Sequence, residues 1–343
     1  MFAYYRHVVK AARPLRVAIV GYGQMGQIRR DVLRSSPDFE LVAIAEVATR
    51  VFDAEDVTVC RSPTEVYILE PDAVFVCTPP NRTTDIVIEA LEHGCHVFAE
   101  KPPGRTVTDA QRILDAASRR ADLKVVFGFN HRYRPAVRAA KTIADQGSHG
   151  RILWLRGLYG RTPNGLQNSW RNVPAVSGGG ILLDQGIHLL DLFRFFCGDF
   201  HEVAGLTGRS QSHLLVEDDA VVILRSRLGP VAQLHSSASL IRNMFRLEVG
   251  LEHAQLDING MSGKSDLYGH ETLTINRHEP NRDVAETLRY PDVLPWEAET
   301  RAFASAILDD DAIISAGPED ALAAMSTIDS IYRQIRETVP TAT

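Results

Sequence analysis

Asp184 and His188 stand four residues apart in a segment whose apolar pattern predicts a helix from Ile181 to Phe196. Residues at this spacing share one face of an α-helix. A carboxylate beside an imidazole raises the pKa of the imidazole and fixes its orientation, and the glycines at 178–180 let a ligand approach the backbone. Taken alone, the pair is also typical of an acid and a histidine satisfied inside a core, or of part of a metal site. Because no other ligands cluster with it in the sequence, we expect no metal.

Lys101 follows a predicted strand, His96–Ala99, and therefore stands near the carboxyl end of that strand. Ligands bind at this edge of open α/β sheets. Removing a hydride from a carbinol carbon leaves a proton on oxygen that a base must take, and a partly buried lysine can take it or polarise a carbonyl. From the residues alone, Lys101 is also typical of a surface turn.

A glycine-rich loop follows the first predicted strand, at residues 17–26, Val-Ala-Ile-Val-Gly-Tyr-Gly-Gln-Met-Gly. In Gly-x-Gly-x-x-Gly, the first glycine permits a tight turn, the second lets the backbone approach a pyrophosphate, and the third lets the next helix pack on the strand. Glu46, 20 residues after the loop, can accept hydrogen bonds from the adenosine ribose. We expect dinucleotide binding by Gly21, Tyr22, Gly23, Gln24, Met25, Gly26 and Glu46. Glycines that serve packing only, beside a solvated acid, are the alternative.

Glu46 also bears on the choice of cofactor, because its charge would repel a ribose 2′-phosphate. No lysine or arginine follows it before Arg50. We expect NAD, with NADP as the alternative if Arg50 turns toward the phosphate.

The order of strands and helices predicts an α/β protein. Up to about residue 128, continuous apolar strands alternate with helical patterns, which indicates a Rossmann-type, doubly wound parallel sheet. The predicted strands are Leu15–Val20, Phe39–Ala45, Ala73–Cys77, His96–Ala99 and Leu123–Phe127.

After about residue 150 the pattern changes. A strand at Ile152–Leu158, a loop at 160–180 and the helix from Ile181 precede several runs with period two, which predict a large, mainly antiparallel sheet with one open face. Two helices, Trp296–Leu308 and Pro318–Arg336, close the chain. We expect a dinucleotide-binding domain at 1–130 and an α+β substrate-binding and oligomerisation domain at 131–343, whose closing helix packs back on the first domain.

Length and composition exclude several classes of protein. At about 150 residues per domain, 343 residues suggest two domains. The 37 Lys and Arg against 43 Asp and Glu leave a formal net charge of −6, so we expect no nucleic-acid partner. No apolar run reaches the roughly 20 residues of a membrane span, and we interpret residues 1–16 as a short extension. Scattered cysteines favour a reducing cytoplasm over a disulfide framework; they are Cys60, Cys77, Cys95 and Cys197.

Short motifs in a characteristic order run through nearly the whole chain. They are Gly21–Gly26, Thr78-Pro79-Pro80-Asn81, Glu100-Lys101-Pro102, Gly128-Phe129-Asn130, Trp170-Arg171, Gly178-Gly179-Gly180, Asp184-Gln185-Gly186-Ile187-His188 and Ile331-Tyr332. In this order and spacing the chain resembles the glucose–fructose oxidoreductase, inositol dehydrogenase and MocA family. Enzymes of that family oxidise or reduce a sugar or cyclitol carbon with a nicotinamide cofactor.

The resemblance implies roles for particular residues. It implies that Lys101, Asp184 and His188 are catalytic. We assign proton transfer to His188 and a hydrogen bond on the same oxygen to Lys101, with these roles exchanged as the alternative. Asp184 then holds a neighbouring hydroxyl or the histidine. An unusual, cis peptide is expected before Pro102.

Further site residues follow from the resemblance and from their positions. Glu100 and Asn130 are implied near the nicotinamide end, and the remaining expected cofactor contacts are Thr78, Pro79, Pro80, Asn81, Lys101 and Arg171. The expected substrate contacts are Lys101, Asn130, Arg132, Tyr159, Trp170, Arg171, Asp184 and His188. Two departures from the family concern the adenosine end: Thr83-Thr84-Asp85 stands where a histidine is common, and the segment from Glu46 to Cys60 is short.

The substrate class stays open at this point. His131, Arg132 and Arg134 form a basic cluster beside Asn130. If this cluster faces the site, it favours a phosphorylated or nucleotide-linked sugar as the substrate. Otherwise it is a solvated face or an interface. The leading hypothesis is an NAD(P)-dependent sugar or cyclitol dehydrogenase. A redox-neutral enzyme with tightly bound NAD and a non-catalytic dinucleotide sensor are the alternatives. Members of the family usually pair through the open face of such a sheet, so the resemblance predicts a homodimer or homotetramer.

Overall fold

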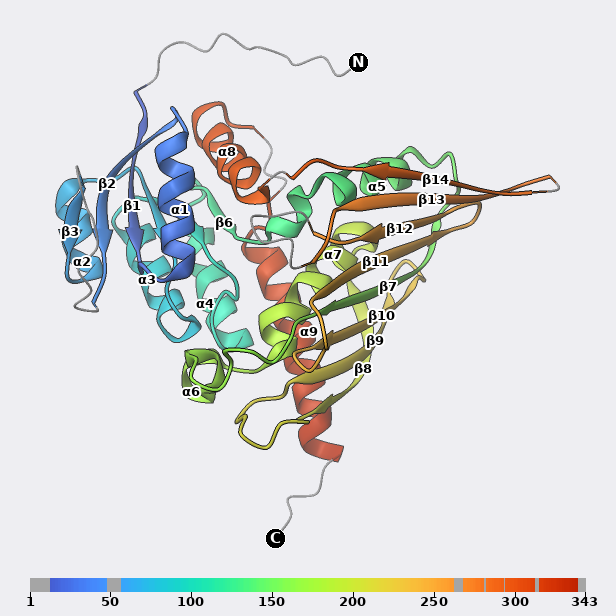
Figure 1. Cartoon of the computed structure of the whole chain (residues 1–343). Coiled ribbons are helices and arrows are strands. Elements are labelled where there is room, and N and C mark those ends of the chain that lie inside the picture. Colours follow the sequence, from blue (N-terminus) through green and yellow to red (C-terminus); the bar gives the residue numbers. More distant parts are fainter. Residues whose placement is uncertain are drawn as a thin grey trace.

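The computed structural model describes residues 13–47, 57–261, 268–280, 282–292, 294–311 and 315–338. Within these ranges the chain forms two sheets that lie beside each other, with helices around and between them (Figure 1). The first 12 residues of the expected extension, and Arg50, lie outside the described residues. No helix in the described part of the chain is both long enough and apolar enough to cross a membrane.

The first sheet is parallel, with six strands in the order β3-β2-β1-β4-β5-β6. The chain starts in the centre of the sheet and winds outward to each edge, as in doubly wound dinucleotide-binding folds, so the predicted Rossmann-type sheet is confirmed. Its central strands β1 and β4 are apolar except for Arg16, because helices cover both faces of the sheet. The strands are β1 Leu15–Val20, β2 Phe39–Ala45, β3 Thr58–Cys60, β4 Ala73–Val76, β5 His96–Ala99 and β6 Val125–Phe127. The helices between them are α1 Gln24–Ser35, α2 Pro63–Val66, α3 Pro80–Glu92 and α4 Val107–Ser118.

The second sheet has eight strands in the order β14-β13-β12-β11-β7-β10-β9-β8, antiparallel except where β7 meets β10. The predicted large and mainly antiparallel sheet is therefore confirmed. Helices α7 and α9 lie on the face turned toward the parallel sheet (Figure 1). The strands are β7 Ile152–Gly160, β8 Phe200–Gly208, β9 Asp219–Ser226, β10 Val231–Ser237, β11 Met244–Leu251, β12 Gln255–Asn259, β13 Thr272–Glu279 and β14 Arg282–Arg289. The helices of this half are α5 Pro135–Gln146, α6 Pro174–Ser177, α7 Ile187–Cys197, α8 Pro295–Leu308 and α9 Pro318–Thr338.

Both closing helices reach back to the parallel sheet. Phe303 of α8 is fully buried and makes edge-to-face contacts with Phe75 of β4 and Phe98 of β5. Helix α9 packs against α4, and Ala316 just before it pairs with Phe127 of β6. Helix α9 thus contacts elements of the parallel sheet's half of the chain, whereas the division into two domains at residue 130 stays a prediction.

Several elements are not predicted by the sequence pattern. Strand β9 has apolar residues on both faces: Val221 and Ile223 are exposed and alternate with the buried Ala220, Val222 and Leu224. Its period of two is therefore hidden. Strand β14 is exposed along almost its whole length and has no apolar face to detect. The sequence pattern also leaves out β3, β8 and α5.

Candidate active site

One large cleft lies between the two halves and begins at the glycine loop. Its volume is about 1000 Å³, at the upper end of the roughly 300–1,000 Å³ usual for small-molecule sites. Most of the predicted site residues line it, and they come from both sheets. They are Gly21, Tyr22, Gly23, Gln24, Met25, Glu46, Thr78, Pro79, Pro80, Glu100, Lys101, Asn130, Tyr159, Trp170, Arg171, Asp184 and His188.

The glycine loop provides a surface for close approach of a ligand. Gly21 has a φ of +93°, and a Cβ there would lie 2.8 Å from the carbonyl of Cys77. A Cβ on Gly26 would collide with the carbonyl oxygen of Gly21, so this glycine serves helix packing and does not line the cleft. A Cβ on Gly23, by contrast, would meet nothing within 4 Å. Gly23 precedes α1 without capping the helix through a side chain, so the first N–H groups of α1 face the space that a pyrophosphate would fill.

Glu46 lies beside this loop at the end of β2. Its Oε2 accepts a hydrogen bond from the backbone N–H of Tyr22 at 2.8 Å, which holds the carboxylate at the mouth of the cleft. The predicted partner of the adenosine ribose is thus in reach of the loop. Asn81, another predicted cofactor contact, lies in the first turn of α3 and does not line the cleft.

A buried arginine of α1, Arg29, holds Glu100, which directly follows β5. The Nε of Arg29 donates to Glu100 Oε1 at 2.8 Å, and its Nη2 donates to Glu299 Oε2 at 2.8 Å. Burial raises the pKa of Glu299 to about 8, with Arg29 opposing the shift and Glu100 adding to it. One cation therefore connects α1, the end of β5 and α8 beneath the floor of the cleft.

Lys101 and Asp184 form the contact between the two halves at the inner end of the cleft. Lys101 Nζ donates to the backbone oxygen of Asp184 at 2.5 Å and lies 3.2 Å from its Oδ1. The other carboxylate oxygen lies 3.3 Å from Arg161 Nη2 and 3.2 Å from Arg171 Nε. Burial alone would raise the pKa of Asp184, but the charges of Lys101, Arg171 and Arg161 together hold it well below its usual range.

The segment that carries Asp184 is not the regular α-helix that its sequence predicts. Leu182–Gly186 forms a π-helical turn, and the α-helix α7 begins only at Ile187. The four-residue spacing of an α-helix therefore does not apply between Asp184 and His188, although both line the cleft. Single π-turns of this kind occur frequently at functional sites because they re-aim side chains within a helix.

His188 lies deep in the cleft, in an aromatic environment. Its ring stacks on that of His131, with centroids 4.2 Å apart and planes 15° apart, and Phe129 and Tyr159 contact it edge-on. The pKa of His188 is well below its ordinary value because the ring is buried and Lys101 is close; Asp184 opposes this shift only in part. Asp184 does raise this pKa, as expected, but burial and Lys101 outweigh its effect, so the net shift is downward. No hydrogen bond to His188 Nδ1 occurs within the described ranges, so Asp184 does not orient the ring through that atom.

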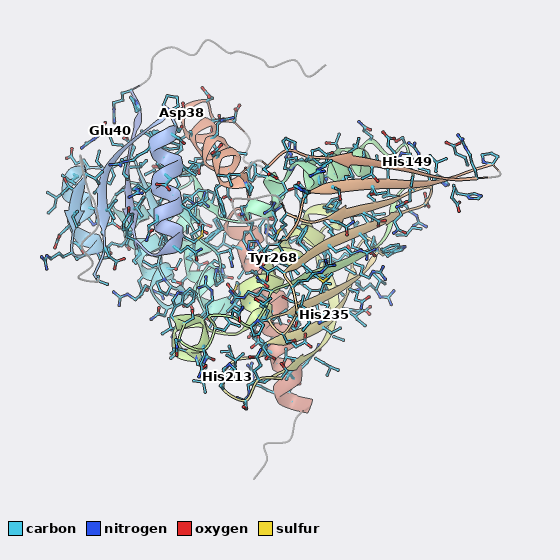
Figure 2. All side chains as sticks on the ribbon, viewed as in Figure 1. Asp38, Glu40, His149, His213, His235 and Tyr268 are labelled. Atoms are coloured by element: carbon cyan, nitrogen blue, oxygen red, sulfur yellow. The ribbon has the colours of Figure 1, made fainter. Side chains whose placement is uncertain are left out.

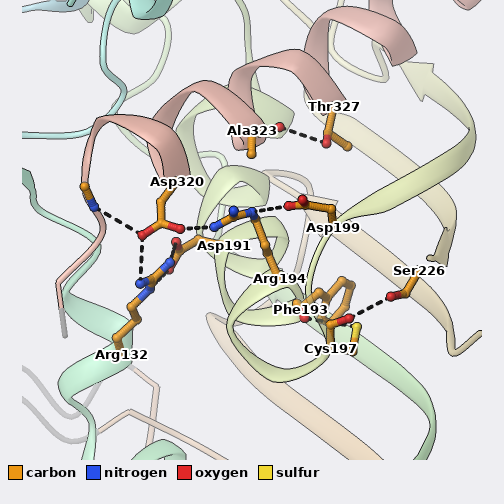
Figure 3. Close-up of polar contacts among 11 residues, drawn as sticks. Arg132, Asp191, Phe193, Arg194, Cys197, Asp199, Ser226, Asp320, Ala323 and Thr327 are labelled. Atoms are coloured by element: carbon orange, nitrogen blue, oxygen red, sulfur yellow. Dashed lines mark hydrogen bonds and ion pairs between the residues drawn. The ribbon is translucent and has the colours of Figure 1, made fainter. Parts of the chain in front are cut away.

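The basic cluster after Asn130 is divided among different parts of the structure. Arg132 turns away from the cleft, and its Nη2 lies 2.6 Å from Asp191 Oδ1 on α7 while its Nη1 lies 3.2 Å from Asp320 Oδ2 on α9 (Figure 3). Arg194 pairs with the same Asp320 (Figure 3). Arg134 faces Glu271 at 3.1 Å. The structure thus does not place Arg132 with the other predicted substrate contacts, because two carboxylates hold it in the core.

Three further residues at the site have no signal in the sequence. Arg161 pairs with Asp184, whereas Tyr268 and Trp296 line the cleft. Tyr268 lies near the centre of the molecule, where the two halves meet (Figure 2). Each is separated from the predicted catalytic residues by a long or irregular stretch of chain, so only tertiary contacts bring it to the site. Among the described residues, no three His, Cys, Asp or Glu side chains gather in a possible metal-ligand set.

The remaining predicted contacts surround Asp184. Trp170 and Arg171 lie in a short 3₁₀ turn, Trp170–Asn172, with the Arg171 guanidinium 4.4 Å from the centre of the Trp170 ring. Tyr159, at the end of β7, is buried and contacts the rings of His131 and Tyr268. The arrangement therefore combines a dinucleotide-type loop with a lysine, an aspartate and a neutral histidine at one end of a single cleft.

Two comparisons by sequence agree with this geometry. Residues 15–129 match the family described as "Oxidoreductase family, NAD-binding Rossmann fold", and residues 137–260 match the "GFO/IDH/MocA C-terminal domain". A levoglucosan dehydrogenase of Pseudarthrobacter phenanthrenivorans is 32% identical over 55% of this chain and 53% of its own. The chain thus spans about half the length of this curated relative. An inositol 2-dehydrogenase of Rhizobium meliloti is 25% identical over 94% of this chain and 97% of its own.

Solved structures share the fold. A levoglucosan dehydrogenase in complex with NADH superimposes with a TM-score of 0.82 over 94% of this chain and 97% of its own, at 21% identity. An oxidoreductase from Kribbella flavida gives a TM-score of 0.84 over 96% of this chain and 98% of its own, at 22% identity. The chain belongs to the Gfo/Idh/MocA family of oxidoreductases, and residues 15–129 are its NAD-binding Rossmann domain.

Proposed function

We propose that this protein is an NAD-dependent dehydrogenase that oxidises a CH–OH carbon of a sugar, a sugar derivative or a cyclitol. The observation that carries the proposal is the convergence of Lys101, Asp184 and His188 at the inner end of the cleft that starts at the glycine loop. The levoglucosan and inositol dehydrogenases among the relatives support the same substrate class.

The site residues can carry the proton of the reaction. His188 is neutral at neutral pH because burial and Lys101 lower its pKa, so it can accept the proton of a substrate hydroxyl. Lys101 donates a hydrogen bond to the same oxygen and stabilises the negative charge that develops there. Asp184 holds the Lys101 ammonium group through its carbonyl and carboxylate oxygens. When bound, NAD⁺ supplies the hydride acceptor.

The cofactor residues follow the length of the cleft. Gly23 and the first turn of α1 would hold the pyrophosphate, Glu46 the adenosine ribose, and Glu100 and Asn130 the nicotinamide end. Glu46 favours NAD over NADP, because a carboxylate at this position repels a 2′-phosphate. The described cysteines are free thiols, which supports a cytoplasmic location. The two proposed domains meet at residue 130.

A homodimer or homotetramer formed through the open face of the second sheet is part of the proposal. Leu206 on β8 lies opposite Val221 on β9, and Ile223 follows on the same face; their exposed fractions are 77%, 38% and 54%. Cross-strand apolar neighbours of this kind expose a continuous patch that association would bury.

The first prediction concerns Lys101. Lys101→Met should lower kcat for the oxidation of a sugar or inositol by about 10²–10⁴-fold, because the hydrogen bond to the reacting oxygen is lost. NADH formation at 340 nm measures kcat, and fluorescence titration with NADH should give nearly the wild-type Kd. Lys141→Met, on α5 and paired with Asp145, is the matched control and should keep full turnover.

Other outcomes decide against the dehydrogenase. A Lys101→Met variant with near wild-type turnover would remove Lys101 from the mechanism. A wild-type protein that holds NAD after purification, yet forms no NADH with any sugar or cyclitol, would support the redox-neutral alternative instead.

The second prediction concerns pH. Because His188 must be neutral to accept a proton and its pKa lies well below 6.5, kcat/KM for oxidation should stay level from pH 8 down through pH 6.5 and fall only in more acidic buffer. The profile is measured between pH 5 and 9 with one substrate. A rate that still rises through pH 8 would assign proton removal to Lys101.

The third prediction concerns the adenosine end. Glu46→Gln keeps an oxygen that can accept from the N–H of Tyr22 but removes the charge, so the ratio of kcat/KM for NAD to that for NADP should fall about tenfold. Glu40→Gln makes the same change at the exposed, opposite end of β2 (Figure 2) and should leave the ratio as it is. An unchanged ratio in Glu46→Gln would show that Glu46 does not select the cofactor.

The fourth prediction concerns assembly. Ile223→Lys introduces a charge into the exposed apolar patch and should shift the molar mass from dimer or tetramer toward monomer, as measured by size-exclusion chromatography with light scattering. Ile241→Lys is the control, because Ile241 is 98% exposed and lies outside the strands. A wild-type protein that is monomeric at micromolar concentration would overturn this assembly.

A further inference from the structure

Positive charge is in excess around Asp184, where the inner end of the cleft meets a side pocket that Arg161 lines. Three cations, Lys101, Arg161 and Arg171, lie within 3.3 Å of the oxygens of one carboxylate, that of Asp184. A single carboxylate balances one of these charges and leaves two. The neighbouring imidazoles of His131 and His188 supply no negative charge.

Asp184 does not use the full bonding capacity of the two arginines. Its ion-pair distances of 3.2–3.3 Å exceed the roughly 2.7–2.9 Å of strong charge-assisted hydrogen bonds. The Nε atoms of Arg161 and Arg171 are buried, and neither makes a hydrogen bond within the part of the chain that is described. Arg171 Nε faces Asp184 Oδ2 at ion-pair distance, but without the geometry of a hydrogen bond.

The other carboxylates near the inner end of the cleft have partners of their own. Glu100 is bonded to Arg29, and Glu271 is bonded to Arg134 and to the backbone N–H of Ala136. Glu217, which lines a side pocket together with Arg161 and Arg171, accepts hydrogen bonds from the backbone N–H groups of Gly180 and Leu182 and from the hydroxyl of Tyr332. None of these acids forms an ion pair with Arg161 or Arg171 among the described contacts.

The side chains of Lys101, Arg161 and Arg171 are 17%, 24% and 32% exposed, so an anionic ligand can reach them. Buried polar donors without partners and like charges held close together are both unfavourable, and an anion bound here would relieve both. We propose that the substrate is a sugar acid, such as a uronate or an aldonate, whose carboxylate binds Arg161 and Arg171 beside the hydroxyl that is oxidised. The planar fork of a guanidinium group matches a carboxylate with two parallel hydrogen bonds. This inference rests on the proposed dehydrogenase function and narrows its substrate class.

A direct test compares sugars that differ only in their anionic group. D-Glucuronate, D-glucose and D-glucose 6-phosphate are assayed with NAD⁺ by NADH formation, and D-galacturonate is compared with D-galactose in the same way. We expect kcat/KM for each uronate to exceed that for its neutral aldose at least about tenfold. Equal values for acid and aldose overturn the inference while leaving the dehydrogenase intact, and a preference for the phosphate ester overturns the assignment to a carboxylate.

Variants of Arg161 test whether this arginine causes the preference for the uronate over the aldose. Arg161→Met should lower the ratio of kcat/KM for uronate to that for aldose about tenfold or more, and Arg161→Lys, which keeps the charge, should restore much of it. The control is Arg119→Met, an exposed arginine at the end of α4, which should leave the ratio unchanged. If Arg161→Met instead weakens NADH binding and leaves the ratio as it is, the arginine serves the cofactor phosphates and the inference fails.

A failure of the proposed function is recognised separately. If no sugar is oxidised with NAD⁺ or NADP⁺, binding of D-glucuronate and of D-glucose to the NADH-saturated protein is measured by isothermal titration calorimetry. The inference requires that the acid binds at least about tenfold more tightly than the aldose. Equal affinities, or no binding of the acid, overturn it whatever reaction the protein performs.

Discussion

The contact between Lys101 and Asp184 joins the two halves of the molecule at the inner end of the cleft. Lys101 comes from the end of β5 in the parallel sheet, and Asp184 comes from the π-helical turn that precedes α7. The ammonium group bonds to a carbonyl and a carboxylate of the same residue, so a shift of either half would break two interactions at once. This ion pair, together with those of Asp184 with Arg161 and Arg171, therefore connects the two halves at the inner end of the cleft.

A buried charged residue, Arg29, connects the segments beneath the cleft. Arg29 is fully buried and bonds to Glu100 and to Glu299, which is 270 residues away along the chain. Removing one member of such a group leaves an uncompensated charge in the core, at a cost of about 3–5 kcal/mol. Helix α8 is consequently fixed on the parallel sheet by a charge network and by the packing of Phe303. A second network, in which Arg132 bonds to Asp191 and Asp320, connects α7 with α9 in the same way.

Local sequence signals predicted most of the parallel sheet, because its inner strands, such as β1, β4 and β5, are largely buried on both faces and stand out as apolar runs. The bounds of β1, β2 and β5 match the prediction residue for residue. Strands with a mixed or fully exposed pattern, such as β9 and β14, gave no such signal. The glycine loop could also be predicted from the sequence. Only glycine allows both the positive φ at Gly21 and the close packing at Gly26.

The sequence by itself determined the family, the fold class and the residue types that reach the cleft, because these depend on motifs and on local periodicity. Tertiary structure alone decided how those residues are charged and paired. The pKa of His188 is lowered rather than raised because burial and Lys101 outweigh Asp184, and Arg132 is a core residue because two acids from distant helices surround it. Arg161 joins the site only through the fold. Burial and charge partners arise from contacts between distant segments, and no local pattern encodes them.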